Sequence, residues 1–350
     1  MDERRAREVT LLESFETVQP PAPSWGDDDR RWADRVAAEA AAPGGAPEAF
    51  IATRAGHALQ RLVPREPALA RLAATKPWHA GGALAIVAVA FVLGIAGDSL
   101  GGGRRINLLA PPLWGVLAWN IVVYLLLVVL PLLRVARRGR VREGPLVRTA
   151  EWLLRVRQRL PRASAGGSAV ALRRFVELWA VRTRRLSLLR GETALHLGAA
   201  ALALGLVAGL YSRGLVLDYR VGWESTFLDA GAAHAVVTTA LRPASLLSGI
   251  ALPDAASFAS LRTTPDADNA GAPAAPWLHL IALTLALVVV VPRLVLAAGC
   301  GIAAAWRARR FALPIDDPSF QRLARLGSGG ASRVVVVPYA AMPSPQATLG

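Results

Sequence analysis

The sequence predicts an all-α, polytopic membrane protein with four transmembrane helices in two hairpins. Its 350 residues are 53% hydrophobic and only 19% charged, a composition too apolar for an ordinary soluble domain of this length. Four segments are each apolar for close to the roughly 20 residues that a helix needs to cross a bilayer. The arginines gather in one loop between these segments, which sets the orientation of the chain. We therefore expect both termini on the cytoplasmic side, with cytoplasmic helical parts and the start of a C-terminal α/β domain.

The four apolar segments cover residues 80–97, 108–133, 193–211 and 277–299. Each is expected to form a helix, because hydrocarbon offers no partner for unpaired backbone amides. About ten residues separate the first two segments, so these two helices are expected to be antiparallel neighbours.

The loop between the second and third segments carries the charge that orients the chain. Residues 134–190 contain 16 arginines and three glutamates, a net charge of +13, whereas residues 213–275 carry a net charge of −2. Short loops rich in arginine stay on the cytoplasmic side, so a multi-pass membrane protein with this loop in the cytoplasm is expected. The resulting regions are a cytoplasmic helical N-terminal region (1–79), the first transmembrane hairpin (80–133), a basic cytoplasmic helical hairpin (134–191), the third transmembrane helix (192–212), a periplasmic cap loop (213–275), the fourth transmembrane helix (276–300) and a cytoplasmic tail (301–350).

The expected cytoplasmic parts show helical periodicity. In residues 134–191, two amphipathic patterns at 146–160 and 172–186 predict two helices that fold back on each other. Their arginine faces are either solvated faces that keep the loop inside or a surface for anionic lipid headgroups or an acidic partner. In the tail, a helix at 319–326 is followed by a GSGG turn and by the buried strand RVVVV at 333–337. A lone strand needs a sheet, so either the sheet is completed elsewhere or the chain continues into a cytoplasmic α/β domain, which is the alternative that we favour.

The common catalytic and metal-binding patterns are missing from the sequence. Its single cysteine, Cys300, excludes an internal disulfide, and its five scattered histidines lack the spacing of a zinc site. The glycine-rich GSGGAS at 327–332 follows a helix and precedes a strand, which is the reverse of a phosphate-binding loop. We therefore expect no enzyme activity, no cofactor, no metal and no nucleic-acid partner.

Polar side chains inside the spans are the sharper functional signal, because a charge near the middle of a bilayer costs on the order of 3 kcal/mol. Glu192 and His196 share one face at the start of the third span, and Arg293 follows Pro292 in the fourth. If the two faces meet, Glu192 and Arg293 pair with His196 between them, as a structural pair or as a proton or ion path. Alternatively, Arg293 extends to the cytoplasmic interface and Glu192 only begins its helix. Asn120 in the second span is suited to a hydrogen bond between helices.

The expected periplasmic loop carries three aromatic residues at helical spacing. Tyr219, Trp223 and Phe227 are four residues apart, and Glu224 lies among them. On a helix they would form one apolar stripe, which could cap the helix bundle, lie on the bilayer or form a binding site.

Four ordered segments resemble one bacterial family. They are INLLAPPLWGVLAWNIVVY at 106–124, YRVGWESTFLDA at 219–230, LPDAASFASLR at 252–262 and RVVVVPYAAMPSPQ at 333–346, and the resemblance extends from WADRVAAEA at 32–40 to the C-terminus. The family is an uncharacterised integral-membrane family, known only as a domain of unknown function. The resemblance implies a multi-span inner-membrane protein that is commonly encoded beside a GTPase with its own C-terminal uncharacterised domain. It lends no activity and no functional residues.

These observations favour a non-enzymatic inner-membrane scaffold or anchor for a cytoplasmic partner, with that GTPase as the expected partner. Further expected partners are the lipid bilayer, its anionic headgroups and other copies of the chain. The alternative is an oligomeric transporter or channel that uses Glu192, His196 and Arg293, because four spans rarely enclose a pore alone. No inverted repeat is obvious between the two hairpins, which lowers the weight of this alternative. Sensing through the outer loop around Trp223 is a third hypothesis.

Overall fold

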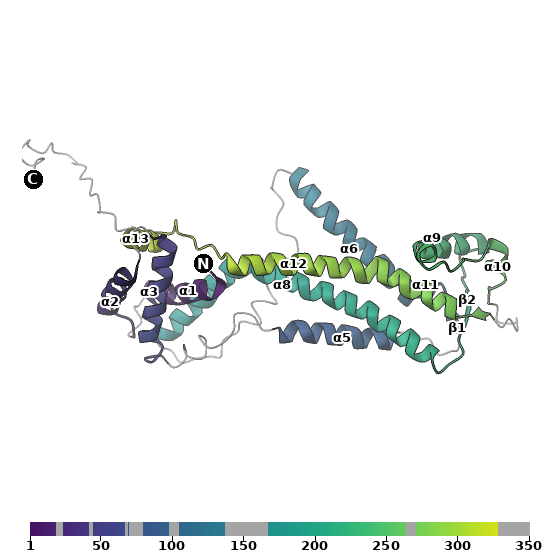
Figure 1. Cartoon of the computed structure of the whole chain (residues 1–350), viewed down its shortest axis with the longest axis horizontal. Coiled ribbons are helices and arrows are strands. Elements are labelled where there is room, and N and C mark those ends of the chain that lie inside the picture. The colour runs from purple at the N-terminus through teal and green to yellow at the C-terminus, as the bar shows by residue number, and fades with distance from the viewer. Residues whose placement is uncertain are drawn as a thin grey trace, which may run out of the picture. The chain divides into compact units, whose positions relative to one another are not determined.

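The computed structural model is mostly helical and describes residues 1–18, 24–41, 45–66, 69, 80–97, 105–136, 167–263 and 271–327. The chain divides into two compact units (Figure 1). Unit 1 comprises Met1–Pro77, Gln158–Arg182 and Ala308–Gly350, and unit 2 comprises Trp78–Arg157 and Thr183–Arg307.

Unit 1 is built largely from short helices. They are α1 (Glu3–Thr17), α2 (Asp27–Ala40), α3 (Pro47–Leu62) and α13 (Pro318–Gly327), together with the beginning of α8 (Gly167–Gly214). The helix starts follow capping rules: the Asp2 side chain accepts the Arg5 amide at the start of α1, α2 has three aspartates in its first turn, and α3 begins with Pro47. Helix α3 packs against α1, α2 and α13, and its Phe50 is buried there with Phe15 of α1.

Three of the described helices are long and apolar enough to cross a membrane. These stretches are Leu113–Leu133 in α6 (Pro111–Ala136), Ser168–Gly214 in α8, and Ala275–Arg309. The last consists of α11 (Ala275–Leu285), the π-helix η2 (Ala286–Val290) and α12 (Val291–Arg309). The first predicted span is also an apolar helix, α5 (Gly81–Gly97), but a shorter one. These helices indicate a membrane protein.

Helix α8 is longer than the sequence pattern predicts. It runs for 48 residues without a break and joins the predicted helix at 172–186 to the predicted span at 193–211. The boundary placed between residues 191 and 192 is therefore not a helix end. Gly191 lies at this boundary, but one glycine lowers the stability of a helix interior by only about 1 kcal/mol and does not end the helix. The predicted helix at 146–160, the turn after α13 and the strand at 333–337 lie outside the described residues.

A small three-stranded sheet joins three connecting segments of unit 2. Its strands are β1 (Arg105–Asn107), β2 (Arg220–Gly222) and β3 (Ala272–Pro273), with β1 parallel to β2 and β3 antiparallel to it. Next to β3, Gly271 has φ +65°, and a Cβ atom there would lie 2.7 Å from the carbonyl oxygen of Val221. Glycine is required at this close approach. No strand was predicted from the sequence here, because strands of two or three residues have no readable periodicity.

Two helices follow β2. They are α9 (Ala230–Ser248) and the short α10 (Ala255–Ala259). Helix α9 begins after Asp229, whose Oδ1 accepts the amide of Ala232 at 2.7 Å, and ends at Gly249 with φ +73°. It continues through Pro243, a residue type that usually ends or kinks a helix.

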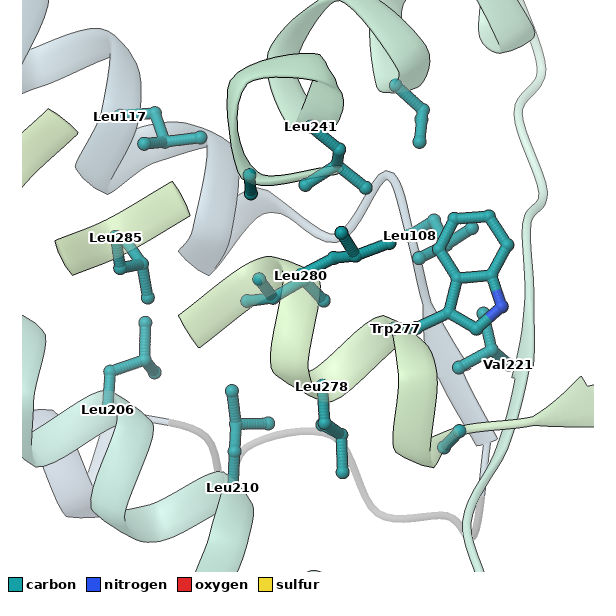
Figure 2. Close-up of a cluster of buried hydrophobic side chains, with 14 of the residues drawn as sticks. Leu108, Leu117, Leu206, Leu210, Val221, Leu241, Trp277, Leu278, Leu280 and Leu285 are labelled. Carbon is teal, nitrogen blue, oxygen red and sulfur yellow. The ribbon is translucent and has the colours of Figure 1, made fainter. Parts of the chain in front are cut away.

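Figure 2 shows the apolar core that holds unit 2 together. Side chains of α11 occupy its middle, between leucines of α8 on one side and leucines of α6 and α9 on the other. The labelled residues are Leu108, Leu117, Leu206, Leu210, Val221, Leu241, Trp277, Leu278, Leu280 and Leu285. This core fixes the rotation of the helices that carry the polar residues described next.

Candidate intramembrane polar site

The site begins with an irregular turn in the last membrane-length helix. The π-helix η2 ends at Val290, two residues before Pro292, whose ring nitrogen has no hydrogen to donate to the preceding turn. The carbonyl oxygen of Val288, four residues earlier, instead accepts a hydrogen bond of 3.0 Å from the hydroxyl of Tyr124 on α6. Single π-helical turns inside α-helices are frequently found at functional sites.

Arg293 lies in the first turn of α12 and is only 5% exposed. Its Nε donates to Oδ1 of Asn120 at 2.7 Å, and its Nη1 donates to Nδ1 of His196 at 3.0 Å. The guanidinium carbon lies 5.3 Å from the centre of the Tyr124 ring, within the range of a cation–π contact. Arg293 therefore points into the helix bundle, and the expectation that it extends to the membrane interface is wrong.

Asn120 is oriented by a second hydrogen bond. Its Nδ2 donates to the carbonyl oxygen of Val116 at 2.8 Å, one turn earlier on α6, so its oxygen faces Arg293. Asn120 thus bonds between helices, as its sequence position suggests.

The charge of this site is positive. Among the described residues, no carboxylate lies within ion-pair distance of Arg293. Arginine keeps its proton in proteins and can only donate hydrogen bonds. Nδ1 of His196 therefore accepts the bond from Arg293 and carries no proton. A buried cation surrounded by neutral partners attracts anions.

Of the three residues predicted to meet, Glu192, His196 and Arg293, the structure brings only two into contact. His196 and Arg293 are hydrogen-bonded, whereas the exposed Glu192 accepts a contact of 3.6 Å from the Sγ of Cys300. Sequence reasoning missed Tyr124 and gave Cys300 no role. The available signal for Tyr124 was its spacing of four residues from Asn120, which places both on one face of α6.

The aromatic residues of the outer loop do not form the expected helical stripe. Part of this segment is the strand β2, and Trp223 directly after it is fully buried, whereas Phe227 is 95% exposed and Glu224 is exposed. Tyr219 is half-buried. The expectation that Tyr219, Trp223 and Phe227 share one apolar helix face is therefore wrong. Pairing with strands far away in the sequence overrides the local helical spacing.

The contacts of Trp223 are packing contacts within the fold. Its Nε1 donates to the carbonyl oxygen of Phe258 at 2.9 Å, and the two rings stack with centres 5.5 Å apart. The guanidinium of Arg262 lies 5.3 Å from the centre of the Trp223 ring. These contacts hold α10 against β2.

A second polar cluster, in unit 1, was not predicted. Arg54 on α3 is almost fully buried and pairs with Glu16 of α1 at 2.7 Å and with Asp34 of α2 at 2.5 Å. Burial alone would lower the pKa of Arg54, but the two carboxylates raise it above its ordinary value. Arg182, in the part of α8 that belongs to unit 1, donates to both carboxylate oxygens of Glu13. We call these residues the ion-pair cluster.

A groove of about 450 Å³ lies beside the ion-pair cluster. Helices α1, α2, α3 and α13 line it, and charges of both signs face it, among them Asp27, Arg30, Arg31 and Arg322. Within the part of the chain that the structure describes, no group of three or more His, Cys, Asp or Glu side chains could hold a metal ion.

Part of the chain matches an uncharacterised protein family. Residues 156–327 match a family described as a protein of unknown function, DUF2868. The matched range includes all of α8 and extends through the small sheet's β2 and β3 to the end of α13. No curated protein and no solved structure matches the chain.

Proposed function

We propose that the protein is a non-enzymatic membrane scaffold that holds a cytoplasmic partner, and that unit 1 is the part that binds it. The observation that carries this proposal is the ion-pair cluster, in which Arg54 joins α1, α2 and α3 and Arg182 joins α8 to α1. Replacing buried ion pairs by apolar side chains is often neutral or stabilising, so such pairs are weak evidence for stability alone. Their presence here favours a role in fixing one arrangement of helices, and hence one specific surface.

The proposed location is the cytoplasmic face of a bacterial inner membrane. The net charge of +13 in residues 134–190 supports this orientation. We count α5 as a fourth span because its backbone touches the apolar part of α8, where a Cβ atom on Gly205 would lie 3.1 Å from the Cα of Gly94. An even number of spans puts both ends of the chain on the same side.

The proposed partner is the GTPase implied by the family resemblance, and the proposed contact is the groove of unit 1. Because the groove presents both arginines and carboxylates, it suits a mixed protein surface better than a ligand of one charge sign. Anionic lipid headgroups near the arginine-rich segment would add to the anchoring.

Charge reversal in the groove tests this proposal. The full-length protein would be co-purified from detergent with the neighbour-encoded GTPase, as wild type and as the double variant Arg31→Glu, Arg322→Glu. Arg4→Glu is the matched control, because Arg4 is highly exposed on α1 and does not line the groove. Wild type and control should retain the GTPase and the double variant should lose most of it. Because Arg322 also lies 3.7 Å from Asp34 of the ion-pair cluster, the comparison is made at a temperature at which circular dichroism shows the double variant to be folded. Equal recovery of the GTPase with and without this protein would reject the scaffold, and full retention by the double variant would reject the groove.

The polar site around Arg293 favours a second candidate, an oligomeric anion transporter or channel. Its buried guanidinium has only neutral partners among the described residues. In addition, the hydroxyl of Thr284, one turn before Val288, is buried without a hydrogen-bond partner, which is unusual for a native interior. Both features suit a path in which water or an anion supplies the missing contacts.

Flux measurements separate the two candidates. Proteoliposomes would be loaded with a chloride-sensitive dye, and wild type would be compared with Arg293→Gln and with the control Glu192→Gln, which lies outside the hydrogen-bonded site. The transporter candidate expects chloride flux that Arg293→Gln abolishes and the control keeps. Absence of wild-type flux, or equal flux in all three proteins, would reject it.

A further inference from the structure

The hydrogen bond between Arg293 and His196 exists only while one ring nitrogen lacks a proton. His196 is 7% exposed and Arg293 is 5% exposed, and Nη1 of Arg293 donates to Nδ1 of His196 at 3.0 Å. Nδ1 accepts only in the neutral imidazole whose proton is on Nε2, and arginine offers no acceptor. When Nδ1 takes up a proton, two N–H groups face each other and neither can accept. Protonation of His196 therefore breaks this bond.

The other contacts of Arg293 keep its guanidinium in place when that bond breaks. Oδ1 of Asn120 accepts from Nε and not from Nη1, at 2.7 Å, and the Tyr124 ring centre lies 5.3 Å from the guanidinium carbon. Both of these partners are neutral. Arg293 carries one positive charge, and a protonated His196 adds a second one beside it. Because two like charges in a site removed from water disfavour each other, the protonated site needs a negative charge.

The helices packed around His196 carry few charged or titratable groups. None of α5, α6, α11, η2 and α12 contains an aspartate or a glutamate. Apart from arginine, the titratable side chains of α6 and α11 are Tyr124, whose hydroxyl donates to a backbone oxygen, and His279, which is bonded to Tyr211. The other basic residues nearest to the site along each helix are Arg134 on α6, Arg190 on α8 and Arg307 on α12.

Glu192 is the nearest carboxylate along α8, and it lies outside the site. It precedes His196 by one helical turn, which is about 6 Å along the axis. Its side chain is exposed and accepts the contact of 3.6 Å from the Sγ of Cys300 on α12. Within the part of the chain that the structure describes, it bonds to neither His196 nor Arg293. The negative charge that a protonated His196 needs therefore has to come from a bound ligand.

We infer that this site binds a proton and a small monovalent inorganic anion together. The proton comes from water and is held on Nδ1 of His196. The anion lies between this N–H group and Nη1 of Arg293 and accepts a hydrogen bond from each. Only hydrogen bonds are exchanged, and the net charge of the site is the same with both ligands bound as with neither. The inference rests on the anion site of the transporter candidate and makes its transported species an anion accompanied by a proton.

Nuclear magnetic resonance of the histidine ring nitrogens tests this inference on the full chain. Protein with isotope-labelled histidine would be titrated with acid in lipid nanodiscs, once in sodium chloride and once in sodium gluconate of equal concentration, because gluconate is a much larger anion. The spectrum of His196→Gln identifies the His196 signals among those of the five histidines. His234, whose Nε2 is bonded to the carbonyl oxygen of Pro253, is the internal control.

Chloride should move the titration of His196 and leave that of His234 unchanged. Two coupled binding events typically change each other's affinity about 5–150-fold, so His196 should take up its proton at a pH about one unit higher in chloride than in gluconate. Equal titration of His196 in the two salts, or no protonation in either, would overturn the inference. This comparison uses the wild-type chain, so it does not depend on the folding of a variant.

A substitution that supplies a fixed negative charge tests the geometry. Asn120→Asp keeps the shape of the side chain that accepts from Arg293 and takes over the electrostatic role of the anion, so the chloride effect on His196 should disappear. Glu192→Gln is the control and should retain the effect, because Glu192 lies outside the site. A chloride effect of wild-type size in Asn120→Asp would overturn the inference.

The flux measurement with the chloride-sensitive dye separates this inference from the transporter candidate. A chloride-dependent titration of His196 without flux would support coupled binding and reject transport. Flux with a chloride-independent titration would overturn the inference and leave the transporter candidate standing.

Discussion

Gly205 of α8 and Gly94 of α5 are in backbone contact. A Cβ atom on Gly205 would come within 3.1 Å of the Cα of Gly94 and would collide with the carbonyl oxygen of Phe91. A Cβ atom on Gly94 would likewise collide with the carbonyl oxygen of Leu202. Small residues allow this close approach between membrane helices, whose association depends on packing. The contact binds α5 to the apolar part of α8.

The first prediction is that Gly205→Leu separates these helices. Overpacking a tight contact costs about 1–3 kcal/mol, and here the leucine would meet backbone that cannot rotate away. The unfolding temperature in detergent, followed by circular dichroism, should fall clearly. Gly191→Leu is the control in the same helix, because no atom lies within 4 Å of the Cβ position there. Equal unfolding temperatures for the two variants would contradict the packing described for α5.

The second prediction concerns Arg54. Arg54→Gln leaves Glu16 and Asp34 without their buried partner, and breaking a buried pair in this way costs about 3–5 kcal/mol. Hydrogen exchange of peptides from α1, α2 and α3, measured by mass spectrometry, should accelerate at least about a hundredfold. Arg31→Gln serves as the control, because its pair with Asp28 is exposed. Exchange rates that stay at the wild-type level in Arg54→Gln would show that the ion-pair cluster does not hold unit 1 together.

The third prediction is a pH dependence carried by Asp29. Its hydrogen bond from Arg65, at 2.7 Å, holds the pKa of this carboxyl below its usual value, and a bond from the Gly26 amide and the charge of Arg61 act in the same direction. A lowered folded-state pKa means that the stabilisation is present above the unfolded pKa of about 3.9 and is lost as the pH falls through the folded value.

Asp29→Asn should therefore lower the stability of the α2–α3 contact at pH 6. The further loss of stability below about pH 4 should be smaller in this variant than in wild type. Hydrogen exchange or thermal unfolding between pH 6 and pH 3 measures both effects. Asp28→Asn is the control, because that side chain is almost entirely exposed. A variant whose acid loss has the wild-type size would show that Asp29 does not contribute.

The fourth prediction links Tyr124 to Pro292. Tyr124→Phe removes the donor to the Val288 carbonyl and should cost about 0.5–1.5 kcal/mol. Pro292→Ala restores a backbone N–H that can bond to the preceding turn. The cost of Tyr124→Phe should then be smaller in the Pro292→Ala background, as a double-mutant cycle of unfolding free energies would show. Strictly additive effects would indicate that the hydroxyl and the proline act independently.

Features with a local signal were readable from the sequence. The apolar runs at 108–133 and 277–299 each coincide with a membrane-length helix, because length and composition alone decide that property. The hydrogen bond between His196 and Arg293 agrees with one of the two alternatives that the sequence left open for these residues.

Features that depend on distant packing were not readable. Glu192 is one turn from His196, yet it contacts Cys300, because the rotation of α8 and α12 is set by the core and not by their own sequences. Phe227 and Trp223 have helical spacing, but β2 pairs with β1 and β3 instead. Arg54 gave no signal among the many charges of the N-terminal region, since only the meeting of α1, α2 and α3 makes it buried.

The parallel pairing of β1 with β2 imposes an order on biosynthesis. Asn107 pairs with Gly222, so the edge of β1 has no β2 to bond with until the ribosome has added the whole of α6 and α8. At about 5–20 residues per second, that interval is on the order of 10 s. Until then the early segment with α5, β1 and α6 lacks partners that it has in the folded chain, and the sheet can form only after α8 has been made.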